Sequence, residues 1–513
     1  MNMRTVLLPT MMMTMVVIAM YSQGSIGIFD KSLDIGKPKQ KGETTYLPLE
    51  SSYYLKGSGY NIWFNRDEFQ YAFKEISGDF ILTANFKLMG KGVNPHRKIG
   101  WMIRSNQEAD AAHVTATVHG DGLTVMQWRA LRGAYMRDPE DEIFSPKSDV
   151  EILQLERSGD EYIMSIANPG EPLPEIGRTK EPKLGDQVLA GIFICSHDST
   201  AIEEGIAWNV RIVKTKRDHD LIDGLKLGSK LEVMSINDGI RKIVYEDTTN
   251  IEAPTWTRDS KRIIFNKAGK LYSIQREGSL PKWIKTGKKD ICITNHLVSS
   301  DGRSLGISTK PDTLAKGQAG IFYIPLDGGE PKTILEIDQA NIHGWSPDGR
   351  EVVYSAQIPG KSTFLNIFKK SISGSKATQL TFHTRGHADG SEYSPDGRYI
   401  YYNSNVSGTM QIYRMRADGK DQEQLTFGSG NNWFPHPSPD NKWLAFLTYP
   451  YQVESSERPY CKNVALRIMP ISGGAPKVVA YLYGGEGSFN SPAWSPDGKY
   501  LAFISNSLPL ENK

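Results

Sequence analysis

A four-residue phrase, Ser-Pro-Asp-Gly, recurs with small variations through the second half of the sequence. Its six copies begin at Thr257, Ser299, Ser346, Ser394, Ser438 and Ser495. Successive copies start 42 to 57 residues apart, which is the period of one four-stranded blade of a β-propeller. Pro presets φ, Asp bonds the local backbone and Gly accepts a positive φ, so each copy marks a tight turn. The repeat therefore predicts an all-β fold with a six-bladed propeller.

The last repeat has room for only two strands, because residues 499–513 are all that follow its turn. A strand pair that precedes the first complete repeat, at residues 230–235 and 242–245, can supply the missing two. Pairing the two ends in one blade closes the ring and removes exposed sheet edges. We therefore expect the propeller to span residues 229–513, after a charged linker at residues 216–228.

The six repeats resemble the TolB-type propeller repeats, which are WD40-like and belong to the PD40 class. The resemblance covers residues 225–506 and implies a TolB-like, six-bladed propeller. The sequence before residue 225 does not resemble the amino-terminal domain of TolB itself. The resemblance therefore does not imply a role in Tol–Pal transport.

Several runs within residues 26–215 alternate with a period of two, as strands with one buried face do. These runs are 80–88, 113–119, 124–128, 150–156, 162–166 and 188–193. Short strands separated by turns predict a β-sandwich or jelly roll that precedes the propeller. Four phrases resemble the DUF1349-type, concanavalin-like jelly-roll domain: Ser77–Phe80, Gly100–Arg104, His119–Gly122 and Ile192–His197. That resemblance implies a lectin-like sandwich, often associated with glycan binding.

Residues 1–22 have the pattern of an export signal. Arg4 supplies the positive charge, and the apolar run Val6–Met20 is short for a bilayer span and contains Pro9. We expect this segment to be removed, which leaves a periplasmic or secreted protein without a membrane span. The alternative is that the run is kept as a short membrane anchor.

Charge balance and motif content exclude several classes of protein. The 60 basic and 58 acidic residues give a net charge of +2, which offers no basic surface for nucleic acid. Cys195, Cys292 and Cys461 are far apart and form no CxxC pair, so we expect neither a zinc ribbon nor a disulfide scaffold. The sequence also lacks a G-x-S-x-G elbow and a phosphate-binding loop.

The residues just before each turn are expected to line the central channel of the propeller. His296 and His343 each precede the first residue of their turn by three positions, so they are equivalent in two blades. The next two blades add further candidates: His387, Asp389, Glu392 and His436. Converging histidines can bind a divalent metal, with His296, His343 and His387 as candidate ligands. The alternative is a water-filled polar channel, and no other cofactor is expected.

The predicted strand at residues 113–119 has one polar face, while Val114, Ala116 and Val118 point to the core. With its neighbours on adjacent runs, this polar face gives a candidate glycan-binding surface: Arg104, His113, Thr115, Thr117, His119, Gln127, Trp128 and Arg129. Polar and aromatic side chains together suit sugar hydroxyls and sugar C–H faces. The alternative is the ordinary solvated face of an antiparallel sheet.

These patterns favour an exported, non-catalytic binding protein that recognises a glycan, an extracytoplasmic protein or both through jelly-roll and propeller surfaces. The alternative is a metal-dependent, glycan-active enzyme, either a polysaccharide lyase or a glycoside hydrolase, that uses the channel histidines. Certain oligogalacturonate lyases are propellers with a His-bound metal, and resemblance to them keeps this alternative open. We prefer the binding function because the sequence names no complete catalytic set.

Overall fold

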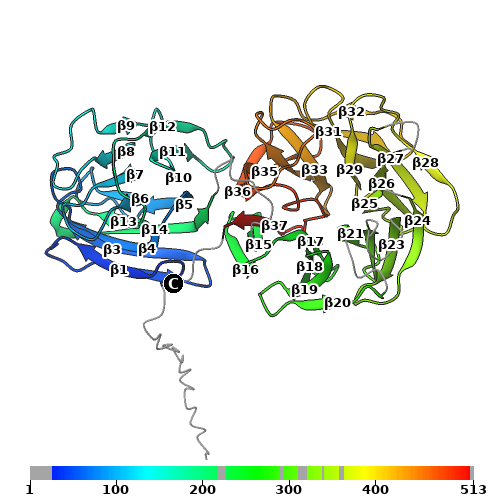
Figure 1. The fold of residues 1–513 in the computed structure, drawn as a ribbon, viewed down its shortest axis with the longest axis horizontal. Coiled ribbons are helices and arrows are strands. Elements are labelled where there is room, and N and C mark those ends of the chain that lie inside the picture. The colour runs from blue at the N-terminus through cyan, green and yellow to red at the C-terminus, as the bar shows by residue number, and fades with distance from the viewer. Residues whose placement is uncertain are drawn as a thin grey trace, which may run out of the picture.

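The computed structural model of the chain contains a β-sandwich followed by a β-propeller (Figure 1). The structure describes residues 26–215, 227–287, 293–309, 320–337, 340–357 and 363–508. The predicted export signal at residues 1–22 and residues 216–226 of the predicted linker lie outside this part of the chain. Among the described residues, no helix is long and apolar enough to cross a membrane.

Two seven-stranded sheets form the sandwich. From edge to edge, the first sheet contains β1 (Lys31–Ile35), β4 (Phe69–Ile76), β13 (Val188–Cys195), β6 (Lys98–Arg104), β7 (His113–His119), β8 (Thr124–Arg129) and β9 (Glu142–Phe144). The second contains β12 (Glu175–Thr179), β11 (Glu161–Ala167), β10 (Ile152–Ser158), β5 (Phe80–Leu88), β14 (Asp198–Lys214), β3 (Ser52–Gly59) and β2 (Glu43–Leu47). The predicted sandwich is confirmed, and its finer assignment to the DUF1349-type jelly roll stays a prediction.

The hydrophobic core of the sandwich lies between the two sheets. Val114 and Ala116 of β7 are fully buried there, as the alternation predicts, together with Leu82 of β5. Trp101 of β6 is also fully buried, and its indole N–H donates to the carbonyl oxygen of Leu153 at 3.2 Å. Alternation thus directs one face of each sheet inward, and the opposite faces are left for other contacts.

The propeller has five four-stranded blades and a sixth that closes the ring. The first two blades are β17 (Ile251–Trp256), β18 (Arg262–Lys267), β19 (Lys270–Gln275), β20 (Lys282–Ile284), and β21 (Ile293–Val298), β22 (Ser304–Thr309), β23 (Gly320–Pro325), β24 (Lys332–Glu336). The next two are β25 (Ala340–Trp345), β26 (Glu351–Ala356), β27 (Asn366–Ser371), β28 (Ala377–Gln379), and β29 (Ala388–Tyr393), β30 (Tyr399–Ser404), β31 (Gln411–Arg416), β32 (Glu423–Gln424). The fifth is β33 (Asn431–Pro437), β34 (Trp443–Tyr449), β35 (Lys462–Pro470) and β36 (Lys477–Gly484).

The repeated turn joins the first and second strands of every blade. In all six turns the hydroxyl of the first residue donates to the aspartate two residues later, at 2.6 Å. The same hydroxyl accepts a hydrogen bond from the backbone N–H five residues later, where the second strand begins. The recurring aspartates therefore hold the turns together.

The sixth blade is built from both ends of the propeller sequence. β15 (Gly228–Ser235) pairs with β37 (Tyr500–Ser507) along its whole length, and β16 (Arg241–Asp247) adds the outer strand. A bridge between Trp494 and Leu501 supplies the inner edge. This pairing confirms the predicted closure and the count of six blades.

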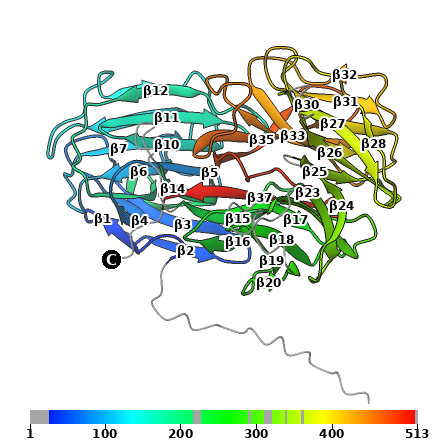
Figure 2. The same cartoon turned by 45° about the vertical axis from the view of Figure 1, so that its right-hand side comes forward.

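The sandwich lies beside the fifth and sixth blades in both views (Figures 1 and 2). Gly170 forms a backbone bridge with Val478 of β36. Arg211 of β14 and Arg241 of β16 both donate to Glu232 of β15, at 2.7 and 2.8 Å, and Glu232 is fully buried. Backbone pairing and a buried ion cluster therefore join the two domains.

Candidate functional site

The inner strands of the first five blades each contain a register shift, which turns side chains to new directions. His296 pairs with Ile307 across its sheet, whereas His343 falls inside the shift between Ile342 and Gly344. The two histidines are therefore equivalent in sequence but not in their surroundings.

His343 belongs to a buried polar cluster at the inner strands of the third and fourth blades. Its Nε2 lies 2.8 Å from Oδ1 of Asp389 and 3.0 Å from Oγ of Ser355, and Ser355 donates to the same Asp389 oxygen at 2.7 Å. A Ser-His-Asp relay needs the serine and the aspartate on different ring nitrogens. Here one nitrogen faces both groups, so the cluster is not a nucleophilic triad.

Arg458, from the loop between β34 and β35, extends this cluster. Its Nη1 donates to Asp389 at 2.7 Å, and its Nε lies 2.7 Å from Glu486. Its guanidinium also lies 4.9 Å from the ring centroid of Trp433. Burial alone would raise the pKa of Asp389, but His343 and Arg458 hold that pKa below its usual value. The aspartate is therefore a charged structural partner rather than a proton donor.

The remaining channel histidines have separate partners. His296 Nε2 lies 3.4 Å from the carbonyl oxygen of Ile264, and burial lowers the pKa of His296 to about 4. His387 Nδ1 accepts the backbone N–H of Leu365 at 3.1 Å. Each of these two imidazoles thus contacts the backbone of the preceding blade.

His436 contacts Glu392 through Nδ1 at 2.6 Å and the carbonyl oxygen of Phe489 through Nε2 at 2.9 Å. Both ring nitrogens are therefore engaged. Across the described residues, no three His, Cys, Asp or Glu side chains are arranged to hold a metal ion. The predicted channel residues do not fit a metal site.

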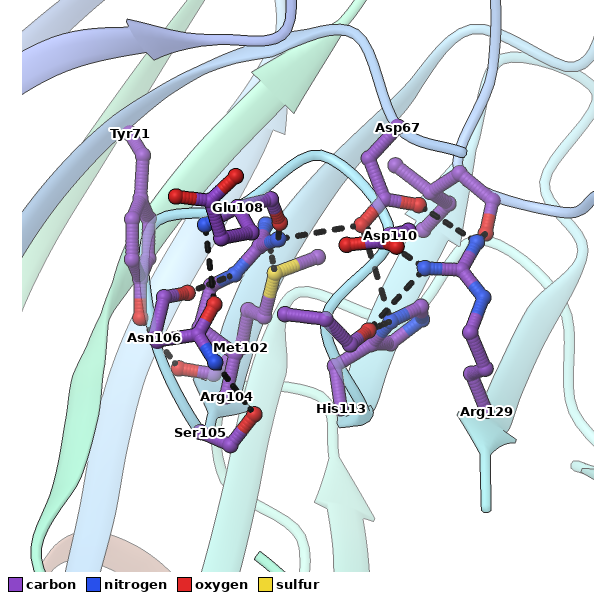
Figure 3. A network of polar contacts seen from close by, with 12 residues as sticks. Asp67, Tyr71, Met102, Arg104, Ser105, Asn106, Glu108, Asp110, His113 and Arg129 are labelled. Carbon is purple, nitrogen blue, oxygen red and sulfur yellow. Dashed lines mark hydrogen bonds and ion pairs between the residues drawn. The ribbon is translucent and has the colours of Figure 1, made fainter. Parts of the chain in front are cut away.

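Three of the predicted sandwich residues converge on Asp67, which comes from the segment between β3 and β4 (Figure 3). Arg129 binds both carboxylate oxygens of Asp67, at 2.7 and 3.0 Å, and Arg104 lies 3.2 Å away. His113 Nδ1 lies 3.8 Å from the same carboxylate. All four side chains are fully buried, and burial with the two arginines keeps the pKa of His113 well below its usual value. The network joins the segment to the sheet.

The other residues of the candidate glycan-binding face are also buried. Thr115 and Thr117 donate to backbone carbonyl oxygens of β8, and Gln127 donates to Glu142 at 3.2 Å. Within the described part of the chain, His119 has no hydrogen-bond partner on either ring nitrogen, and burial lowers its pKa. Trp128 does not share this face, because its side chain lies in the hydrophobic core between the sheets. The alternation of polar and apolar residues predicts which side chains share one side of the sheet, but it does not predict which segments cover that side.

A cavity of about 650 Å³ lies between the sandwich and the propeller. The sandwich contributes Gln154 and Glu156 from β10, and the propeller contributes Arg467, Tyr481 and Tyr483 from β35 and β36. The cavity therefore combines charged, amide and aromatic side chains from both domains.

Sequence reasoning missed this cavity, although one signal pointed to its place. The spacing between the copies at Ser438 and Ser495 is the longest of the five spacings, at 57 residues. The structure places the extra length in β35 and β36, which have nine and eight residues, and in the loop that follows β34. These are the elements that form the propeller wall of the cavity.

The propeller is similar in sequence to a known protein family. Residues 270–457 match the family described as TolB beta propeller domain, PD40. Uncharacterized protein Atu1656 of Agrobacterium fabrum is 35% identical over 289 residues, which cover 56% of this chain and 95% of that protein. The solved structure of a putative TolB from Agrobacterium tumefaciens aligns with a TM-score of 0.51 and 35% identity, over 55% of this chain and 98% of that one.

An oligogalacturonate lyase in complex with manganese is a more distant structural neighbour. It aligns with a TM-score of 0.37 and 13% identity, over 55% of this chain and 83% of that one. A similarity at this level gives no support to the enzyme alternative.

Proposed function

The chain belongs to the family of TolB-like β-propeller proteins, and on that premise we propose that it is a non-catalytic binding protein that holds a glycan between its sandwich and its propeller. A propeller hosts many unrelated functions, so family membership alone names no ligand. The observation that supports the proposal is the cavity of about 650 Å³. Ligand sites are commonly of this size and often lie between domains.

The lining of the cavity favours a sugar over an apolar ligand. Tyr481 and Tyr483 offer aromatic faces, while Gln154 and Asn463 offer amide groups beside several hydroxyl side chains. Aromatic rings contact sugar C–H faces, and amides and hydroxyls bond sugar hydroxyls. The buried cluster around Glu232 fixes the two walls relative to each other, which reduces the ordering cost of binding.

A cavity-blocking substitution tests the proposal. Ala465 lies on the propeller wall, and Ala465→Trp fills part of the cavity with an indole ring. Binding to a glycan array should be lost in this variant. Leu280→Trp is the matched control, because Leu280 is 92% exposed on the first blade and should tolerate the ring without effect. Unchanged binding by Ala465→Trp, with the control behaving as wild type, would place the ligand elsewhere.

We also propose that the chain is exported, on the strength of its charged and then apolar amino terminus at residues 1–22. Expression of the full chain in a bacterial host should give an extracytoplasmic protein that begins near residue 23. Amino-terminal sequencing that returns Met1 from the purified protein contradicts cleavage.

A further inference from the structure

Arg467 of β35 differs from the other cations that line the cavity between the domains. Its Nε is buried, and the described residues give this atom no hydrogen-bond partner and the guanidinium no ion-pair partner. Burial lowers the pKa of Arg467 from its ordinary value. A buried guanidinium N–H that lacks an acceptor is costly, so this cost is relieved when an anion binds there.

The remaining cations of the cavity are neutralised within the protein. Arg211 and Arg241 share Glu232. Lys230 pairs with Glu246 at 2.9 Å, and Arg178 pairs with Glu161 and Glu175 at 2.8 and 2.5 Å. Among the cations that line the cavity, Arg467 alone has no carboxylate partner in the described part of the chain. The free positive charge of the cavity is therefore at one place.

Glu156 of β10 brings the complementary group from the sandwich wall. Its side chain lines the cavity, and no described residue forms a hydrogen bond or an ion pair with its carboxyl group. Side chains that fold inward without partners usually find them in water or in a ligand. The cavity thus presents one unpaired guanidinium from the propeller and one unpaired carboxyl from the sandwich.

We propose that the ligand of this cavity is an acidic sugar, whose carboxylate is bound by Arg467 and whose hydroxyl groups are bound by Glu156. This inference rests on the proposed binding function and adds the chemical class of the ligand. The planar guanidinium matches a carboxylate through two parallel hydrogen bonds. The tyrosines of β36 lie on the same wall and supply the aromatic surface for the sugar ring.

The protonation of Glu156 makes this recognition depend on pH. Burial raises the pKa of Glu156 to about 7, and nearby Asp79, Glu175 and Glu161 add to the rise while Arg178 opposes it. Below that pH the carboxyl is neutral, so it can donate to a sugar hydroxyl without repelling the sugar carboxylate. The ligand keeps its own charge, because a free carboxylic acid has a pKa of about 3 to 4. Affinity should therefore fall as pH rises through about 7.

Calorimetry with the full chain tests the inference. The probe is a trisaccharide of hexuronic acid residues, and the comparison ligands are a neutral hexose trisaccharide and an acidic tripeptide. We expect the hexuronate to bind more tightly than either comparison. Arg467→Met should weaken its binding by about 10- to 100-fold, the usual loss for a hydrogen bond to a charged group. Arg350→Met, in a turn where the side chain is 85% exposed, is the matched control and should not change the affinity.

Two further variants separate ligand recognition from folding. Arg467→Lys keeps the charge without the planar fork, so it should fold and should bind with intermediate affinity. Glu156→Gln should bind the hexuronate with the same affinity from about pH 6 to about pH 8, whereas the wild type weakens over this range.

Each remaining outcome has a clear meaning. No binding of the hexuronate, or binding unaffected by Arg467→Met, overturns the acidic-sugar inference. If the neutral trisaccharide or the peptide binds instead and Ala465→Trp blocks it, the proposed function stands while the ligand class is wrong. If Ala465→Trp affects no bound ligand, the cavity is not the binding site and both proposals fail.

Discussion

Buried charges in the sandwich depend on each other for their stability. Asp67 accepts two hydrogen bonds from Arg129 and lies 3.2 Å from Arg104, and none of the three side chains is exposed to solvent. A buried ion cluster gains little over apolar packing, but loss of one partner leaves an uncompensated charge. Asp67 is therefore the most sensitive position of the network in Figure 3.

Asp67→Asn tests this dependence. The amide keeps the size of the carboxyl but leaves Arg104 and Arg129 without a counter-charge, so the sandwich should lose about 3 to 5 kcal/mol of unfolding free energy. Denaturant unfolding followed by the fluorescence of the buried sandwich tryptophans measures the loss. Asp160→Asn is the control, because its side chain is 78% exposed and its loss should be nearly neutral. A wild-type midpoint for Asp67→Asn would show that the network carries no stability.

At the same scale, the sequence alone predicts that Arg104, His113 and Arg129 lie together. Alternation places them on one side of the sheet, and the structure gathers them around one carboxylate. Asp67 was not predicted, because it lies outside the regular strands and no periodicity reports where such a segment folds. For the same reason, the sequence does not predict that the face expected to bind glycans is covered by other segments.

At the scale of the elements, the repeat was the most informative part of the sequence. The turn phrase fixes where the first strand of each blade ends, because its hydroxyl and carboxylate bond the residues that begin the second strand. Register within the inner strands could not be predicted in the same way. A shift between Ile342 and Gly344 changes the direction of His343 without leaving any mark in the spacing. The described residues show no group of three metal-binding side chains in the channel, while the number of blades and the closure by β15 and β37 were predicted correctly.

At the scale of the whole molecule, function depends on how the sandwich and the propeller are joined. The walls of the cavity come from strands that are more than 300 residues apart in sequence, such as β10 and β36. The sequence pattern within each domain does not indicate which surfaces of the two domains contact each other, so the candidate site could not be predicted from the sequence. Arg211, Glu232 and Arg241 are among the side chains that tie the two walls together.

The domain junction should weaken when Glu232 loses its charge. Burial opposes ionisation of Glu232, but Arg211 and Arg241 hold its pKa well below the usual value, so the group is charged at neutral pH. Because that pKa is depressed on folding, its stabilisation is complete above the ordinary carboxyl pKa and is lost as pH falls through the folded value. Glu232→Gln leaves two buried guanidinium groups unpaired, at a cost of about 3 to 5 kcal/mol.

Arg211 belongs to the sandwich and Arg241 to the propeller, so much of this cost falls on the contact between the domains. Small-angle scattering of Glu232→Gln should therefore show a larger radius of gyration than the wild type, and proteolysis between the domains should be faster. Glu246→Gln is the matched control, because Glu246 lies on the adjacent strand with its side chain 58% exposed and forms an ion pair with Lys230. If Glu232→Gln scatters like the control, the backbone pairing between the domains is sufficient to hold them, and the ion cluster has no part in shaping the cavity.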